Sequence, residues 1–309
     1  MAKKITLAIF ATILIILVAI YTNFTSQIEV KHNYKLPSNN PKDIASYLKD
    51  KNITLNLLDQ IALNYLKPQK GWVYINKTKL PKYQFLKAIS NPYNHYKIAT
   101  IIPGETSYFV LRDIAKKSDY NLTKLQKAYN KYKTYQEGNF VANTYHIPTY
   151  LSEDKAIKYL MTQSIKEYKK VATKNNINFK DLKKYIIIAS ILEKEAANKN
   201  EMPLIASVIY NRLKKKMRLQ VDGSLNYGKF SHTKVTPQQI KNDKTTYNTY
   251  KHKGLPKEPV CNISLTSLKA AIHPAQTDFL YFVKKDNKSH RFSKTFKKHR
   301  ENIKLIEQF

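Results

Sequence analysis

The amino-acid sequence predicts an α+β protein with an N-terminal transmembrane helix, a small α/β subdomain and a larger, mainly helical domain. Residues 5–21 form an apolar run without a charged side chain, and short β-prone runs followed by proline and a helical pattern recur four times before residue 161. From Leu151 onward, the spacing of the apolar residues is mainly helical. The predicted parts are a cytoplasmic tail at 1–4, an anchor at 5–22, the small subdomain at 23–98 and the larger domain at 99–309.

The apolar run at the N-terminus is long enough to cross a membrane. It follows Lys3 and Lys4 and continues for 17 residues, the short end of the roughly 17–25 that a transmembrane helix needs. A cleaved signal peptide is the alternative, but its apolar region would be about 7–15 residues long and end in small residues, whereas this run ends in Ala-Ile-Tyr-Thr. Because residues 22–30 carry no Lys or Arg, the nearby positive charge orients the tail to the cytoplasm. We expect an uncleaved, single-pass anchor with the rest of the chain outside.

The chain is strongly basic, with 54 Lys and Arg residues against 22 Asp and Glu and a net charge of +32. Only five of the basic residues are Arg, and the other 49 are Lys. Nucleic-acid recognition favours the planar Arg fork, whereas Lys spread along the whole chain is typical of a solvated surface. For an exported domain, this composition excludes a nucleic-acid partner and favours anionic lipid or cell wall. The single Cys261 allows no intramolecular disulfide and no Cys-rich metal site, so a packed core must stabilise the fold.

Four strand–helix units are predicted before the helical domain. The strands and the helices that follow them are 34–36 with 44–48, 72–75 with 85–89, 99–102 with 110–115, and 145–147 with 156–160. A proline separates each pair, and a helix start tolerates it because its missing N–H would be unpaired there. The spacing of these prolines is too irregular for a solenoid. We expect the first two units to form the subdomain at 23–98, which either contacts wall glycan or holds the next domain away from the membrane.

Helices dominate the C-terminal half. The predicted helices cover 155–172, 181–197 and 202–216, a loop-rich segment covers 218–262, and 279–283 is predicted to be a buried strand with a hairpin partner around 291–292. In the second helix, the eight residues from Tyr185 to Leu192 include no charged side chain. This helix must therefore be buried on nearly all sides.

Glu193 follows the longest apolar run outside the anchor. Desolvation raises the pKa of a carboxyl, and a carboxyl that stays protonated near neutral pH can donate a proton to a glycosidic oxygen. Alternatively, Glu193 and Glu195 are ordinary surface acids paired with Lys194 or Lys199. Glu195 lies about 200° around the helix from Glu193, so the two do not share one site. A lone acid is expected unless Asp222 approaches from its loop.

The residues on both sides of Glu193 resemble a known family. The matching runs are Ala189 to Glu195 (Ala-Ser-Ile-Leu-Glu-Lys-Glu), Ile205 to Leu213, Met217 to Asp222, Tyr247 to Tyr250, Gly254 to Pro256, Ser267 to Ala271, His273 to Ala275, Leu280 to Val283 and His290 to Ser293, with His299. In this order they resemble the endolytic murein transglycosylases of the YceG-like type. Ile102-Pro103-Gly104-Glu105 and Glu137-Gly138-Asn139-Phe140 match more weakly. The resemblance spans the whole chain, including the anchor.

The resemblance implies a membrane-anchored lytic transglycosylase with a LysM-like subdomain and a larger catalytic domain. Such an enzyme cleaves the MurNAc–GlcNAc β-1,4 bond of peptidoglycan strands, forms 1,6-anhydro-MurNAc ends and terminates the elongation of nascent strands. The implied location is the bacterial inner (plasma) membrane, with the catalytic domain on the periplasmic or extracytoplasmic side and peptidoglycan synthases as partners. The first Glu of the Glu-Lys-Glu block, here Glu193, is the implied essential acid. Departures from the family pattern at 139–145, 223–224 and Glu258 concern the shape of the cleft rather than the reaction.

One carboxyl is enough for this reaction. Glu193 would protonate the leaving oxygen, the C6 hydroxyl of the MurNAc residue would attack C1, and the carboxylate would then accept the proton of that hydroxyl, whereas hydrolases commonly use a second carboxyl and water. No metal or cofactor is expected, because the chain has neither a His-Glu-x-x-His motif nor a Gly-rich phosphate loop. The substrate-binding candidates, each of which could instead form a buried hydrogen bond that holds a loop, are Asn211, Gln220, Asp222, Tyr247, Asn248 and His273. His290 and His299 are expected to be solvated or structural.

Other functions stay open at this point. The chain could be a non-catalytic glycan-binding scaffold for wall synthases, although Glu193 within an otherwise matching motif argues against it. It could also be a muramidase that hydrolyses the same bond without leaving an anhydro end. A polyanion-binding protein is disfavoured by the anchor and by the scarcity of Arg.

Overall fold

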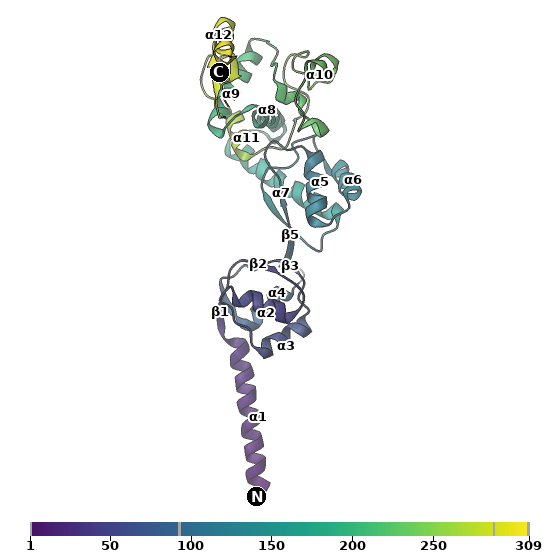
Figure 1. Cartoon of the computed structure of the whole chain (residues 1–309), viewed down its shortest axis with the longest axis vertical. Coiled ribbons are helices and arrows are strands. Elements are labelled where there is room, and N and C mark those ends of the chain that lie inside the picture. The colour runs from purple at the N-terminus through teal and green to yellow at the C-terminus, as the bar shows by residue number, and fades with distance from the viewer. Residues whose placement is uncertain (1, 92–93, 287, 308–309) are drawn as a thin grey trace. The chain divides into compact units, whose positions relative to one another are not determined.

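The chain folds into two compact units, seen in the computed structural model, which describes residues 2–91, 94–286 and 288–307 (Figure 1). Unit 1 comprises the residues up to Ile98 together with His146–Ser152, and unit 2 comprises Ala99–Tyr145 and the residues from Glu153 onward. The chain therefore passes between the units within the strands β5 (His95–Thr100) and β6 (Thr144–Pro148). Helices and strands are mixed and helices dominate, which confirms the predicted α+β fold.

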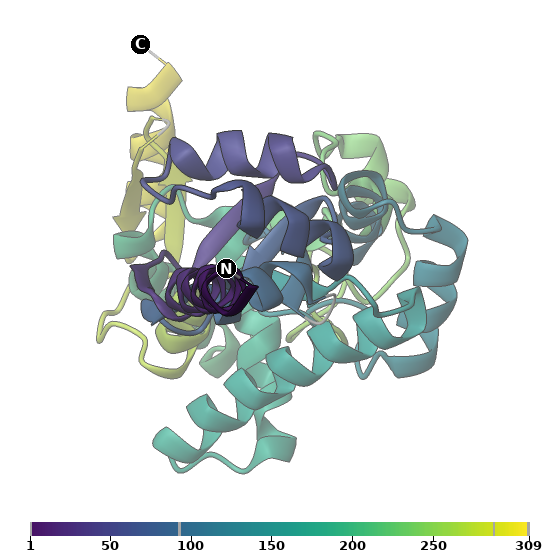
Figure 2. The same cartoon turned by 90° about the horizontal axis from the view of Figure 1, so that it is seen from below.

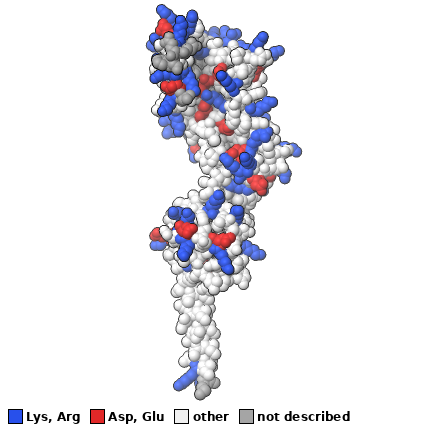
Figure 3. All heavy atoms as spheres, viewed as in Figure 1, with Lys and Arg blue, Asp and Glu red and all other residues white. Residues whose placement is uncertain are grey.

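Unit 1 begins with α1 (Ala2–Thr25), whose apolar side chains face outward along most of its length. Its apolar span, Lys3–Thr25, has a mean hydropathy of 2.6, and none of it is buried within the protein. Twenty-four residues at about 1.5 Å each give about 36 Å, enough for a bilayer core of about 30 Å. On the face that Figure 3 shows, charged side chains are spread over both units, and the sequence of α1 has none after Lys4. Figure 2 views α1 nearly end-on. The helix extends past both ends of the predicted anchor.

A four-stranded sheet organises unit 1. Its strand order is β2-β3-β5-β6, with β2 (Asn33–Leu36) antiparallel to β3 (Gly71–Tyr74) and β3 antiparallel to β5. These strands overlap the four predicted β-prone runs, and the predicted helices are present as α2 (Pro41–Lys49) and α4 (Lys82–Ser90). The core is built on alternate strand residues, and buried Tyr34 of β2 meets Phe85 of α4 edge to face, with ring centres 5.6 Å apart. The sequence did not predict the helix α3 (Leu57–Leu66). It also did not predict the antiparallel pair of strands β1 (Gln27–Glu29) and β4 (Lys79–Pro81).

The acid of α3 lies inside unit 1. Asp59 is fully buried and forms an ion pair with Lys82, Nζ to Oδ2 3.2 Å. The same carboxylate completes a capping box, because it accepts a hydrogen bond from Asn56 N while the Asn56 side chain accepts one from Asp59 N. Asn23, in the last turn of α1, donates its amide to Asp59 Oδ1 at 2.9 Å. Asp59 therefore joins α1 to the rest of unit 1.

Unit 2 is mainly helical. Its helices and strands are α5 (Ser107–Ser118), α6 (Leu122–Tyr132), α7 (Glu153–Lys174), α8 (Leu182–Glu195), α9 (Met202–Lys214), α10 (Pro237–Asn242), α11 (Leu265–Ile272), β7 (Tyr281–Lys284), β8 (His290–Ser293) and α12 (Phe296–Glu307). The three predicted helices correspond to α7, α8 and α9, and the predicted hairpin corresponds to the antiparallel pair β7 and β8. The strand β7 is half-buried rather than buried as predicted, because β7 and β8 form a sheet of only two strands. The Lys-rich C-terminal segment, which the sequence left unassigned, forms α12.

The helix α8 is the centre of the unit 2 core. Residues 186–192 are all buried and pack with residues of α7, α9 and α11. Ser190 is accommodated within this apolar run because its hydroxyl donates to Ile187 O and accepts a hydrogen bond from Val260 N. The prediction that this helix is buried on nearly all sides is confirmed. The helix ends at Glu195, so its last turn carries Glu193 and Glu195 out of this core to half-buried positions.

Candidate active site

Two acidic side chains leave the last turn of α8 toward different partners. Glu193 is half-buried, and its Oε1 accepts a hydrogen bond from Ser264 N at 2.8 Å. Ser264 is the N-cap of α11, so the Glu193 carboxylate lies at the positive end of that helix. A loop also packs on this turn, since a Cβ at Gly104 would lie 3.4 Å from Glu193 O. Gly104 has a φ of +83°, which glycine adopts without strain.

A polar network surrounds the same turn. Lys194 Nζ donates to Ser231 Oγ at 2.7 Å, and Ser231 Oγ donates to Glu105 Oε1 at 3.2 Å. Glu105 Oε1 also accepts a hydrogen bond from Thr106 N, and its Oε2 lies 2.8 Å from His232 Nε2. The network ties the loops around 105 and 231 to the end of α8. Sequence reasoning singled out neither Ser231 nor His232, which stand in no motif, and named Glu105 only within a weak match.

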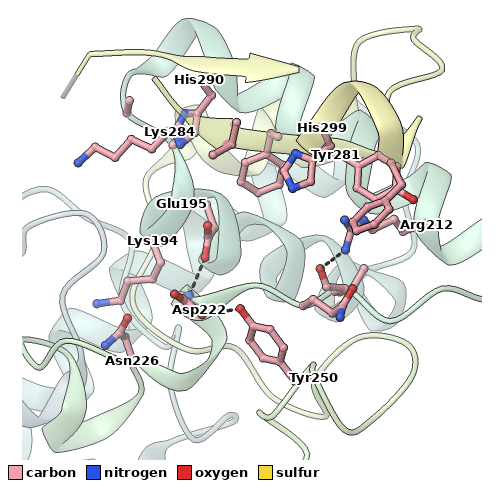
Figure 4. A pocket seen from close by; sticks show the side chains of 18 residues that line it. Lys194, Glu195, Arg212, Asp222, Asn226, Tyr250, Tyr281, Lys284, His290 and His299 are labelled. Atoms are coloured by element: carbon pink, nitrogen blue, oxygen red, sulfur yellow. Dashed lines mark hydrogen bonds between the residues drawn. The ribbon is translucent and has the colours of Figure 1, made fainter. Parts of the chain in front are cut away.

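A cavity of about 620 Å³ lies beside Lys194 and Glu195, and Glu193 is not among the residues that line it (Figure 4). Its charged and polar lining comes from Lys194, Glu195, Arg212, Gln220, Asp222, Asn226, Lys284, His290 and His299, and its aromatic lining from Tyr250, Tyr281, Phe282 and Phe296. Tyr250 donates its hydroxyl to Asp222 Oδ1 at 2.6 Å. The cavity therefore combines aromatic surfaces with side chains of both charges.

Glu195 is not an ordinary surface acid. Its Oε1 accepts a hydrogen bond from Gly223 N at 2.6 Å, and burial, with a smaller contribution from the charge of Asp222, raises its pKa to about 7. A Cβ at Gly223 would lie 2.5 Å from Lys194 Cβ, so the loop can approach α8 this closely only with glycine. Asp222, the second carboxyl considered from the sequence, approaches α8 on the side of Glu195.

The structure brings two of the six predicted substrate-binding residues into the cavity. Gln220 and Asp222 line it, and Gln220 is held in a left-handed conformation with a φ of +49°. Tyr247 stacks on Tyr227, with ring centres 4.1 Å apart, and lies outside the cavity lining.

The other three predicted residues form hydrogen bonds that hold loops. The Asn211 amide donates to the carbonyls of Thr277 and Phe279, and the buried Asn248 amide donates to those of Ile240 and Asp243. His273 is exposed, with Nε2 2.6 Å from Asn175 Oδ1. Asn248 thus forms the buried hydrogen bonds of the structural alternative, whereas the contact of His273 lies on the surface.

Cavity residues that sequence reasoning missed come from distant segments. Arg212 of α9 is buried, and its guanidinium donates to the carbonyls of Leu280 and Leu219. His299 of α12 stacks on Tyr281, with ring centres 5.2 Å apart. Nothing in the local sequence brings α9, β7 and α12 together. His290, expected to be solvated or structural, is structural, with Nδ1 2.8 Å from a carboxylate oxygen of Glu201.

The sequence profile of the YceG-like family matches residues 36–305. The chain belongs to the YceG-like family. The match begins in β2 and ends in α12, so the family pattern includes both units and the α8 turn that carries Glu193.

Several proteins are similar to this YceG-like chain. An endolytic murein transglycosylase of Bacillus subtilis is 36% identical over 220 residues, which are 66% of this chain and 60% of that protein. An endolytic murein transglycosylase of Streptococcus pneumoniae is 31% identical over 155 residues, 48% of this chain and 28% of that protein. The crystal structure of a YceG-like protein of Listeria monocytogenes has a TM-score of 0.56 at 25% identity and covers 90% of this chain and 99% of its own. The matched region thus spans 60% or less of the length of these two transglycosylases.

Glu195 should make the stability of this YceG-like chain depend on pH. Its pKa is raised from 4.5 to about 7, so the folded state binds the proton more tightly, and this contribution to stability is lost as the pH rises from about 4.5 through 7. We therefore expect Glu195→Gln, which keeps an oxygen acceptor for Gly223 N, to raise the free energy of unfolding at pH 8 by about 1–3 kcal/mol and to change it little at pH 4.5. Urea unfolding at both pH values measures the difference.

Glu167→Gln is the matched control, because Glu167 forms a surface ion pair with Lys170, of a kind worth less than about 1 kcal/mol. If Glu195→Gln changed the free energy of unfolding equally at both pH values, the raised pKa of Glu195 would be contradicted. Glu137, buried elsewhere in unit 2, also has its pKa raised by burial to about 7, but it is present in both proteins and cancels.

Proposed function

We propose that this chain is a membrane-anchored endolytic lytic transglycosylase that cleaves the MurNAc–GlcNAc β-1,4 bond of peptidoglycan strands and leaves 1,6-anhydro-MurNAc ends. The observation that carries the proposal is the position of Glu193 at the end of α8. Glu193 ends the buried run of α8, its carboxylate is held by Ser264 N, and it belongs to a chain that the YceG-like profile matches over 36–305. The transglycosylase names of the Bacillus and Streptococcus relatives support the same reaction.

The geometry around Glu193 fits a group that gives and then takes one proton. Ser264 N–H occupies Oε1, which leaves Oε2 as the oxygen for the substrate. The protonated carboxyl gives its proton to the glycosidic oxygen as the bond from that oxygen to C1 of MurNAc breaks. The C6 hydroxyl of the same MurNAc forms the new bond to C1, and its proton goes to the Glu193 carboxylate, which restores the acid. No water enters the product.

The cavity beside Glu195 is the proposed binding site for part of the glycan strand. Tyr250 offers an aromatic face for a sugar ring, and Gln220 and Asp222 offer hydrogen bonds to hydroxyl and acetamido groups. In this proposal Glu195 holds the Gly223 loop in place and does not react.

The apolar α1 and the basic composition support a location at the membrane. We infer that α1 stays uncleaved in the bacterial plasma membrane with both units on the extracytoplasmic side, where the enzyme terminates nascent strands beside the synthases. Unit 1 would then be a LysM-like subdomain that contacts wall glycan or acts as a spacer. The lysines of both units would hold the protein loosely on anionic wall or lipid, an attraction that salt weakens because the Debye length is about 8 Å at physiological ionic strength.

Digestion of isolated glycan strands by the detergent-solubilised full chain in heavy-oxygen water tests the reaction. We expect new ends that mass spectrometry identifies as 1,6-anhydro-MurNAc without heavy oxygen. Heavy oxygen at C1 of the new MurNAc end would show a muramidase instead. Intact strands that nevertheless bind the protein would show a non-catalytic scaffold.

A further inference from the structure

The helix α3 of unit 1 presents an apolar face to its surroundings. Leu57 is 72% exposed, Ile61 45% and Tyr65 83%. These residues are four apart and therefore lie about 40° from one another around the helix, so they form one stripe. Leu58 and Leu66, also exposed, widen it. A contiguous apolar surface of this kind marks an interaction site rather than a scatter of single residues.

This orientation of α3 is held from the opposite side of the helix. Asp59 and Leu63 face the interior and are both fully buried. Asp59 is bound by Lys82 and by its capping box with Asn56, as described above. Turning the helix to bury its leucines would break the ion pair and the cap and would expose Leu63. The apolar stripe is therefore a fixed feature of unit 1.

The anchor ends at the same place. Asn23, two residues before the end of α1, donates to Asp59 Oδ1 at 2.9 Å and accepts a hydrogen bond from Asn56 Nδ2 at 2.7 Å. The first turn of α3 thus lies level with the last turn of α1. Figure 1 shows α3 at the end of unit 1 from which α1 extends, while β2 and β3 lie at the other end. An apolar span that runs from Lys3 to Thr25 meets the outer bilayer surface in that last turn.

We propose that α3 is an interfacial helix that lies on the outer leaflet of the membrane and inserts Leu57, Ile61 and Tyr65 between the lipids. The inference rests on the proposed role of α1 as an uncleaved anchor. Tyrosine is enriched at bilayer interfaces, and the exposed Lys67 and Lys70 that follow the helix match anionic headgroups. A lipid surface fits better than a protein partner because hydrogen bonds join α3 directly to a helix that is itself surrounded by lipid. With two attachments instead of one, unit 1 cannot tilt freely on its anchor.

Fluorescence quenching by lipid tests the proposal on the full chain. Trp72 is the only tryptophan, so Trp72→Phe provides a silent background for Tyr65→Trp and for the control Tyr74→Trp, whose residue is 47% exposed on β3. Both proteins are reconstituted into phosphatidylethanolamine–phosphatidylglycerol vesicles with acyl chains brominated near the headgroup. We expect these lipids to reduce the emission of Tyr65→Trp by about twofold or more, as for side chains seated at the acyl boundary, and to leave Tyr74→Trp nearly unchanged.

Flotation of the same vesicles separates the two levels of the inference. If the chain floats with the vesicles but Tyr65→Trp is quenched no more than Tyr74→Trp, the anchor is supported and the interfacial helix is refuted. A chain that does not float refutes the anchor and the interfacial helix together. If Tyr65→Trp is insensitive to bromine but its emission shifts to the blue as the protein-to-lipid ratio rises, the occupant of the stripe is a second copy and the lipid proposal is wrong.

Discussion

Glu193→Gln should abolish cleavage of glycan strands without disturbing the fold. Gln has the size of Glu and keeps an oxygen that accepts the hydrogen bond from Ser264 N, but it cannot give or take a proton. Loss of a general acid costs about 10²–10⁴-fold in rate, which would leave little cleavage to detect. Quantification of anhydro ends by mass spectrometry measures the rate, and an unchanged unfolding midpoint would show that the fold is intact.

Glu195→Gln is the matched control for this prediction, because it makes the same chemical change two residues away on the same helix. Glu195 does not react in the proposal, since its carboxylate accepts a hydrogen bond from Gly223 N and lies about 200° around the helix from Glu193. We expect this variant to keep most of the activity. If Glu195→Gln lost cleavage and Glu193→Gln kept it, the acid would be the one that lines the cavity, and our assignment of the two carboxyls would be reversed.

Asp59→Ala should strongly destabilise unit 1. It leaves Lys82, whose side chain is 12% exposed, without its carboxylate, and it removes the capping box and the bond to Asn23. Breaking a buried ion pair by removing one partner costs about 3–5 kcal/mol. The only tryptophan, Trp72, lies on β3, so its fluorescence during urea unfolding of the full chain in detergent reports on unit 1.

Asp43→Ala tests whether the loss of stability in Asp59→Ala is caused by the burial of the ion pair. Asp43 is also in the first turn of a helix of unit 1, but it is exposed and its carboxylate accepts a hydrogen bond from Ser38 Oγ. Its removal should cost about 1 kcal/mol or less. Equal losses for the two variants would mean that the ion pair with Lys82 contributes nothing beyond the helix cap. Adding Lys82→Met to Asp59→Ala should recover part of the loss, because no unpaired charge then remains in the interior.

Local pattern was enough to predict much of this fold. The apolar helix α1, the strands β2, β3, β5 and β6, and the helices α7, α8 and α9 all follow from runs of apolar residues whose length and period belong to one kind of element. Burial of 186–192 follows in the same way, because a helical run without a charged side chain on any face is stable only when it is buried in the core. The strands β1 and β4 were missed, because three residues carry too little periodicity. The helix α3 was also missed, although its 10 residues make it longer than α2 and α4.

From the sequence alone came the candidate residues for the site, because the block around Glu193 and the downstream runs resemble the YceG-like pattern, which matches residues 36–305. Only the tertiary structure decided what each of them does. Asn211, Asn248 and His273 hold loops, while Arg212 and His299 meet at one cavity from α9 and α12.

The environments of α3 and Glu195 also depend on contacts between distant segments of the chain. By composition the leucines of α3 belong inside and Asp59 outside, yet Asp59 is buried by Lys82 and Asn23, which lie 23 and 36 residues away in the chain. Burial beside the Gly223 loop, 28 residues further on, raises the pKa of Glu195, and the hydrogen bond from Gly223 N offsets only part of this rise. A side chain's energy depends on the groups that surround it, and when those groups come from distant segments, local periodicity contains no information about them.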